Sequence, residues 1–109
     1  MEYLDREHFM VISLNTKNMV ISIETASIGS LASSIVHPRE IFRNAIRIGA
    51  ASVILAHNHP SGNPTPSSED VEVTKRLYEV GSVVGICVLD HLIIGNGSYY
   101  SFKEEGLVF

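Results

Sequence analysis

The chain has 109 residues, a formal net charge of −4 at pH 7 and a sequence pI near 5.6. A chain of this length can bury one core, so we expect a single domain over residues 1–109. The acidic balance provides a poor field for attracting a polyanion, which disfavours nucleic acid as the main partner. No apolar run approaches the length of a membrane span, so no membrane partner is expected.

The start of the chain and its cysteine usage both indicate a cytoplasmic setting. The N-terminus lacks the basic-then-apolar order of a signal peptide. Cys87 is the one cysteine of the sequence, so an intrachain disulfide is excluded and a reducing compartment fits best. Because Cys87 lies inside an apolar run, we expect a buried small hydrophobe rather than a nucleophile.

Apolar patterning predicts a hairpin and a helix in the first half of the chain. Residues 9–14 and 19–25 have strand composition, and the polar residues 15–18 fit a hairpin connection. A short third strand is expected at 34–36. A proline at the first helical position and an apolar stripe with helical spacing predict a helix over 38–48.

The second half predicts a buried strand, a helix and a final hairpin. Residues 51–56 are apolar without alternation, which is typical of a strand buried on both faces. A helix over 66–80, ended by a glycine at 81, should follow the polar loop. A strand at 83–89, a continuation or further strand at 92–95, and a return strand at 99–102 complete an α/β domain with a mixed sheet between helices.

The stretch HNHPSGNPTPSSED, residues 57–70, concentrates the residues that can carry chemistry. If the buried strand continues through His57 and His59, its period of two places both imidazoles on one face. A loop restricted by three prolines can return Asp70 to them, on the inner face of the next helix. Two histidines and a carboxylate suit catalytic zinc, so we predict one zinc ion per chain. Purely structural roles stay open as well: Ser67 and Asp70 also fit a helix cap, and either histidine alone is more often structural.

These residues give the chain a specific resemblance. The order H-x-H-P, six residues, then S-x-x-D resembles the JAMM motif of MPN/JAB-domain metallopeptidases. With HPRE before it and LDHLIIG after it, the stretch resembles the bacterial RadC family, labelled DNA repair proteins, over essentially the whole chain. Asn58 stands where many eukaryotic JAMM enzymes carry Ser or Thr. The resemblance implies a curved mixed sheet flanked by helices, the MPN/JAB, cytidine-deaminase-like arrangement. It also implies a fragment or short homologue, because the usual N-terminal helical region is missing.

A proton acceptor beside the metal-bound water would complete a hydrolytic site, and the resemblance implies a glutamate upstream of the histidines. Glu7, Glu24 and Glu40 are the choices. We favour Glu7, which precedes the first strand as the family's glutamate does, whereas the helix dipole also accounts for Glu40. Ser67 would donate a hydrogen bond to the oxyanion that forms when water attacks a carbonyl.

Three functions are compatible with the sequence. The first is a zinc-dependent JAMM-type hydrolase, a metallopeptidase or isopeptidase with a peptide or isopeptide substrate. The alternatives are a DNA-repair-associated metal-dependent nuclease and a non-catalytic interaction module. Arg39, Arg43 and Arg47 would offer weak contact with DNA or a repair protein, although we favour the simpler account, a solvated helix face. For the pair Asp90–His91 we expect a structural role, because adjacent strand residues point to opposite faces.

Overall fold

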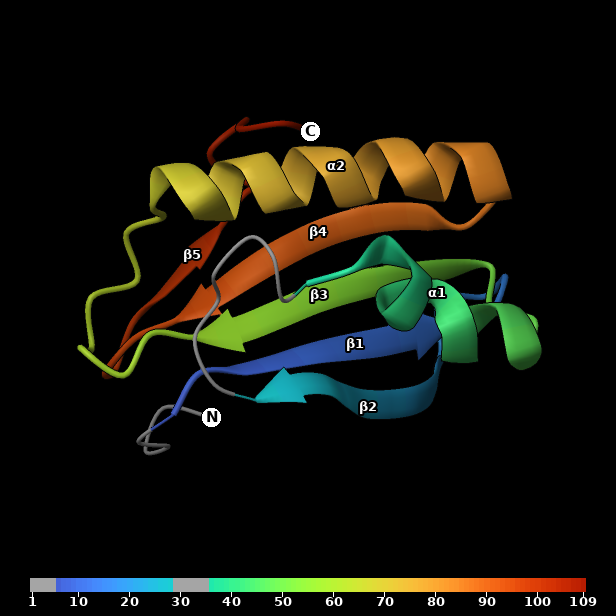
Figure 1. Cartoon of the computed structure of the whole chain (residues 1–109), viewed down its shortest axis with the longest axis horizontal. Coiled ribbons are helices and arrows are strands. Elements are labelled where there is room, and N and C mark those ends of the chain that lie inside the picture. The colour runs from blue at the N-terminus through green and yellow to red at the C-terminus, as the bar shows by residue number, and fades with distance from the viewer. Residues whose placement is uncertain (1–5, 29–35) are drawn as a thin grey trace.

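The structure is a computed structural model and describes residues 6–28 and 36–109. In these residues a five-stranded sheet carries two helices (Figure 1). In chain order the elements are β1 His8–Leu14, β2 Val20–Ile28, α1 Pro38–Arg47, β3 Ser52–Asn58, α2 Ser68–Val84, β4 Cys87–Ile94 and β5 Tyr99–Ser101.

The sheet is mixed, and its strand order is β2-β1-β3-β4-β5. Only the central pair, β3 and β4, is parallel; α2 makes the crossover between them, and the other neighbours are antiparallel. The register places Phe9 of β1 and Ile93 of β4 on either side of His57. The end of β3 is therefore supported by a strand on each side.

Both helices pack on the same face of the sheet and against each other. Alternate residues of β1 and β3 point to this face and join buried side chains of α1 and α2 in one core. The core residues from these four elements are Phe9, Val11, Val53, Leu55, Ile41, Phe42, Ala45, Val73 and Leu77. The expected α/β class with a mixed sheet is confirmed, but the helices lie on one face rather than on either side.

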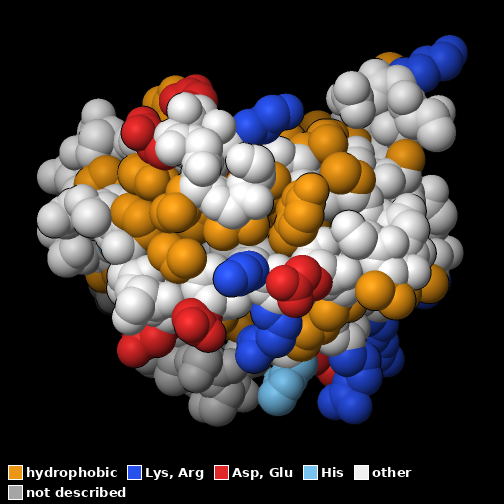
Figure 2. Space-filling model, turned by 90° about the horizontal axis from the view of Figure 1, so that it is seen from above, with side chains coloured by type: hydrophobic (Ala, Val, Ile, Leu, Met, Phe, Trp, Pro, Cys, Tyr) orange, Lys and Arg blue, Asp and Glu red, His pale blue; other side chains and the backbone are white. Residues whose placement is uncertain are grey.

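The surface above the helices remains partly apolar. Viewed from above α2 and the C-terminal segment, hydrophobic side chains gather between charged ones (Figure 2). Ile46, Tyr78, Val83 and Val84 are the exposed large apolar residues that the two helices contribute. No described helix combines the length and the apolar character that crossing a membrane requires.

Several element boundaries differ from those expected from the sequence. The hairpin strands and α1 lie where predicted, and β5 returns beside β4 as expected. The expected strand at 34–36 falls mainly outside the described residues. The two strand segments expected at 83–89 and 92–95 are one strand, β4, which begins only at residue 87. Cys87 is exposed, so the expectation that it is buried was wrong: at the start of β4 it is Val88 that points to the core.

The late start of β4 follows from the length of α2. The expectation that Gly81 ends this helix was wrong, because α2 runs on to Val84 and ends at Gly85 in the left-handed conformation. Gly81 serves a different purpose. A Cβ atom there would lie 2.5 Å from the Ile86 carbonyl oxygen and 3.3 Å from the Phe42 ring. Glycine at this position thus permits α2 to approach both α1 and the chain entering β4.

Gly81→Ala should therefore destabilise the protein although alanine is the better helix former. Helix propensity alone would favour alanine by about 1 kcal/mol, whereas overpacking typically costs about 1–3 kcal/mol. We expect a net decrease in the free energy of unfolding, measured by urea denaturation. The neighbouring exposed Ser82→Ala is the control and should be neutral or slightly stabilising. A Gly81→Ala protein as stable as Ser82→Ala would contradict this packing role.

Candidate metal centre

The two histidines of the HxH motif lie at the C-terminal end of β3. His57 is fully buried, and its ring stacks on Phe9 of β1 with 5.9 Å between ring centroids. His59 follows the last residue of β3, and its N–H donates to the carbonyl of Ile94 on β4 at 2.9 Å. The ring centroids of His57 and His59 are 4.9 Å apart, so the imidazoles share a face as the strand period predicts.

The loop that follows is held against the turn between β4 and β5. The Asn96 N–H donates to the Gly62 carbonyl at 2.9 Å, and Gly62 has φ +88°. A side chain on Gly95 would collide with the Gly62 carbonyl and would lie 2.8 Å from the Pro64 ring. These contacts fix the path of the chain from His59 back to α2.

Asp70 is brought to the histidines by the N-terminal cap of α2. The Ser67 hydroxyl accepts from the Asp70 N–H at 3.1 Å, and the Asp70 carboxylate accepts from the Ser67 N–H at 2.7 Å. The same carboxylate lies 3.3 Å from His57 Nε2 and 3.1 Å from His59 Nε2. The capping role and the metal-ligand role, which the sequence presented as alternatives, are thus compatible in one side chain.

The surroundings of Asp70 keep it ionised. Burial alone raises the pKa of its carboxyl group, but the positive charge that His57 and His59 carry when a proton lies between them and the carboxylate, together with the hydrogen bond from the Ser67 N–H, outweighs this and holds the pKa well below its usual range. The carboxylate is 3% exposed, compared with 0% for His57 and 14% for His59. A ligand approaching this group therefore reaches it from the His59 side.

The contact between His57 and His91 determines which ring nitrogen of His57 is available to bind a metal ion. His57 Nδ1 lies 2.7 Å from Nε2 of His91, a fully buried residue of β4. His91 Nδ1 contacts the hydroxyl of Thr74, and that hydroxyl donates its single hydrogen to the Asp70 carbonyl at 2.7 Å. The hydroxyl must then accept from His91 Nδ1–H, which leaves His91 Nε2 to accept from His57 Nδ1–H. The network thereby assigns the lone pair of His57 to Nε2.

His91 is kept neutral, as this network requires. Burial is the main cause that lowers its pKa well below the usual histidine range. The ring is also stacked on Phe102, with 4.9 Å between centroids and 10° between planes. It is thus held in one orientation.

His59 is oriented in the same way by the loop. Its Nδ1 lies 2.8 Å from the carbonyl oxygen of Asn63, which can only accept, so Nδ1 carries the proton and Nε2 the lone pair. The two Nε2 atoms are 3.0 Å apart. Two lone pairs and a carboxylate directed at one another are mutually repulsive unless a cation, either a proton or a metal ion, lies between them.

His57, His59 and Asp70 could accordingly hold a metal ion. One ligand atom from each residue lies within 4.8 Å of those of the others. Two imidazoles and one carboxylate form a ligand set that suits zinc and leaves a coordination position for water. Each histidine also has the hydrogen-bonded second nitrogen that metal-ligating imidazoles almost always show.

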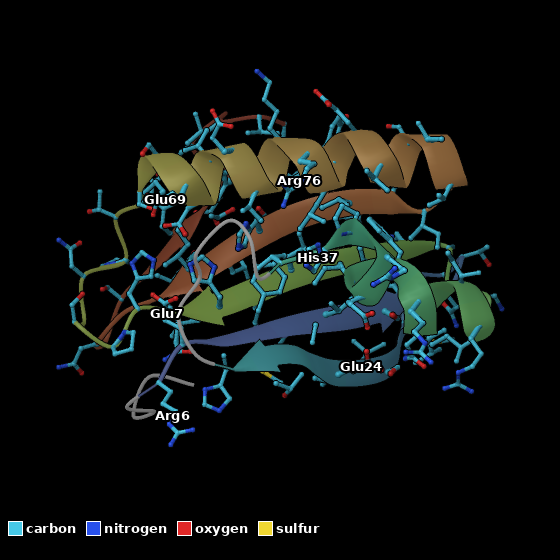
Figure 3. The ribbon with its side chains drawn as sticks, in the orientation of Figure 1. Arg6, Glu7, Glu24, His37, Glu69 and Arg76 are labelled. Carbon is cyan, nitrogen blue, oxygen red and sulfur yellow. The ribbon has the colours of Figure 1, made fainter. Side chains whose placement is uncertain are left out.

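Glu7, the favoured proton acceptor, lies just before β1 at the end of the sheet where β3 finishes (Figure 3). Phe9 pairs with His57, so extending the antiparallel register by two residues puts Glu7 opposite His59. The stacked Phe9 and His57 rings show that this set of alternate residues shares the face of the metal ligands. The register of β1, extended beyond its last pair, thus directs Glu7 toward this group.

The other two glutamates lie elsewhere. Glu24 is on β2 (Figure 3), which is separated from β3 by β1. It lines a surface pocket together with Glu40. The Glu40 carboxylate lies 3.5 Å from the Arg39 guanidinium and 3.8 Å from that of Arg43. Arg47 donates to the Asn44 side chain at 2.5 Å. The expected DNA or repair-protein contact at these exposed arginines stays a prediction.

His91 is the residue of this site that sequence reasoning missed. The alternation that separates Asp90 from His91 is correct: Asp90 accepts from the Ser101 hydroxyl at 2.6 Å and from the Lys103 N–H at 3.0 Å, which is structural. The register pairs His91 with Leu55, on the face of His57. Only the pairing of β4 with β3 reveals this, and no local pattern encodes that pairing.

Comparison with known proteins gives consistent matches. The family described as a RadC-like JAB domain matches residues 1–107. A UPF0758 protein of Caldanaerobacter subterraneus subsp. tengcongensis is 65% identical over 106 residues, 97% of this chain and 46% of its own length. UPF0758 proteins of Moorella thermoacetica and Geobacillus kaustophilus are each 61% identical over 108 residues, covering 99% of this chain. The chain spans about half the length of these relatives, 46–48%.

Removal of His91 Nε2, which accepts the hydrogen bond from His57 Nδ1–H, should weaken metal binding although no metal ligand is changed. We expect His91→Leu to lower zinc affinity by roughly 10–100-fold, the usual effect of losing such a partner. His91→Gln, whose amide oxygen can still accept from His57 Nδ1–H, should lose less. Affinity can be measured by competition with a chromogenic chelator, with exposed His37→Leu as the control. A His91→Leu protein that binds zinc as tightly as wild type would show that the network does not orient His57.

Proposed function

Because the chain belongs to the RadC-like JAB domain family, we propose that it is a zinc-dependent hydrolase of the JAMM type. In this proposal the domain binds one zinc ion and cleaves an amide or isopeptide bond of a peptide substrate in the cytoplasm. The observation that carries the proposal is the convergence of His57 Nε2, His59 Nε2 and the Asp70 carboxylate, with both ring lone pairs turned inward.

The two imidazoles and the carboxylate are the kinds of ligand that a hydrolytic zinc ion has. His57, His59 and Asp70 would hold the zinc ion, which would supply a Lewis acid for the scissile carbonyl and would lower the pKa of a coordinated water molecule. Asp70 contributes a full negative charge, since its pKa is held low, and the two neutral imidazoles contribute none. The more exposed His59 leaves one side of the group open to a substrate.

Glu7 would take the proton from the attacking water and later deliver it to the leaving amine. The register of β1 on β3 supports this role, because its extension by two residues would place Glu7 opposite His59, on the face of the metal ligands. A positioned proton acceptor typically contributes about 10²–10⁴-fold to a rate. Glu24 and Glu40 have no comparable support, because β1 separates Glu24 from β3 and Glu40 is engaged by arginines.

Ser67 would stabilise the oxyanion that develops on the substrate carbonyl. Its hydroxyl oxygen is held beside the site because it accepts from the Asp70 N–H. A serine hydroxyl that accepts one hydrogen bond retains its own hydrogen to donate. A single oxyanion donor is typically worth about 3 kcal/mol of transition-state stabilisation.

The decisive experiment combines zinc content with cleavage in one set of variants. Wild-type protein should bind one zinc per chain by elemental analysis and cleave members of a library of peptide and isopeptide-linked substrates. Asp70→Ala should lose the zinc. Glu7→Gln should keep the zinc and lose cleavage by at least about 100-fold. Glu24→Gln and Glu40→Gln are the matched controls and should retain both.

Ser67, the partner of Asp70 in the helix cap, provides a control for the loss of the cap in Asp70→Ala. Ser67→Ala removes the acceptor of the Asp70 N–H and should cost about 1 kcal/mol of stability while the zinc remains bound. Full zinc occupancy in Asp70→Ala would refute the ligand set, and full cleavage by Glu7→Gln would refute its role. A wild-type protein that binds zinc but cleaves nothing would favour a non-catalytic module, and salt-dependent cleavage of DNA would favour a nuclease.

A further inference from the structure

Asn58, the residue between the two histidines, has a side chain that the proposed chemistry does not use. It is the last residue of β3 and is 1% exposed. Its Oδ1 accepts from the His8 N–H at 2.7 Å, and its Nδ2 donates to the Arg6 carbonyl at 2.9 Å. These two backbone groups lie on either side of Glu7. A single buried amide therefore fixes the chain immediately before and after that glutamate.

The backbone alone cannot hold this segment against β3. The pairing of β1 with β3 ends at Phe9 and His57. Continued by three residues, the register would place Arg6 beside Pro60, which has no N–H to donate to the Arg6 carbonyl. The Asn58 amide offers one acceptor and one donor, as a peptide group does, and replaces the missing part of the ladder.

The arrangement separates two neighbouring side chains. Glu7 lies on the α2 side of the start of β1, where the metal ligands converge, while the Arg6 side chain extends away from α2 (Figure 3). Because successive residues of an extended chain point to opposite faces, a one-residue shift would exchange them. The two hydrogen bonds of Asn58 select the register in which the carboxylate, not the guanidinium, faces the site.

We infer that Asn58 is a positioning residue that holds Glu7 in reach of the metal centre. The inference rests on the proposed function, in which Glu7 moves the proton. The Asn58 amide is hydrogen-bonded to the backbone of Arg6 and His8 and is not one of the candidate metal ligands, so its substitution should leave zinc binding intact and impair only the step that uses Glu7. A merely structural asparagine would instead change stability and leave the rate per folded molecule unaltered.

The test uses Asn58→Ala in the wild-type and Glu7→Gln backgrounds. In the wild-type background we expect one zinc per chain, an unchanged KM and a kcat lower by roughly 10–100-fold, the scale of a misplaced catalytic group. In the Glu7→Gln background Asn58→Ala should lower kcat no further. Asn44→Ala is the matched control, since that half-buried amide donates to the Ser22 hydroxyl at 3.2 Å between α1 and β2. It should leave zinc content, KM and kcat unaltered.

Hydrogen exchange at the His8 amide provides a readout that does not depend on activity. The amide that donates to Asn58 Oδ1 should be protected in wild type and should exchange at least about tenfold faster in Asn58→Ala. If Asn58→Ala does not fold, Asn58→Leu replaces it, because leucine keeps about the same volume but can neither accept from the His8 N–H nor donate to the Arg6 carbonyl.

The failure of this inference can be told apart from the failure of the proposed function. Wild-type kcat in Asn58→Ala, an equal loss of kcat in the Glu7→Gln background, or unchanged exchange at His8 would each overturn the positioning role while the hydrolase stands. A wild-type protein that cleaves no substrate would overturn the hydrolase, and the positioning role would fall with it.

Discussion

A neutral imidazole has one N–H and one lone pair, and this rule governs the whole site. The N–H of His57 is directed to His91 and that of His59 to a loop carbonyl, so both remaining lone pairs face the Asp70 carboxylate. The direction of these hydrogen bonds is set by the Thr74 hydroxyl. Its single hydrogen goes to the Asp70 carbonyl, so His91 must carry its proton on Nδ1. Because these lone pairs and the carboxylate repel one another, the buried group is stabilised by a cation bound between them.

The members of this network come from three elements that the fold brings together. β3 provides the histidines between β1 and β4, and the turn after β4 holds the loop that returns to α2. The cap of α2 aims Asp70, and the next turn of the same helix supplies Thr74. Close approach of α2 to the sheet, which Gly81 permits, keeps the helix in the position that this geometry needs.

The sequence predicts those parts of the site that depend on local periodicity. The period of two in β3 and the helical period in α2 place His57, His59 and Asp70 correctly, because each is fixed relative to its own element. The roles of His91 and Asn58 are not predictable in this way, because they depend on which strands become neighbours and in what register. The length of α2 differs from the prediction for a similar reason: a glycine required by packing has the same appearance in sequence as a glycine that ends a helix.

The most direct measurement is long-range ¹H–¹⁵N correlation NMR of the imidazoles in the zinc-loaded protein. Protons should be found on Nδ1 of His57, His59 and His91, with the metal on Nε2 of the first two and an unprotonated Nε2 on His91. Coordination of His57 through Nδ1, or a proton on Nε2 of His91, would contradict the hydrogen-bond order from which the metal centre is inferred.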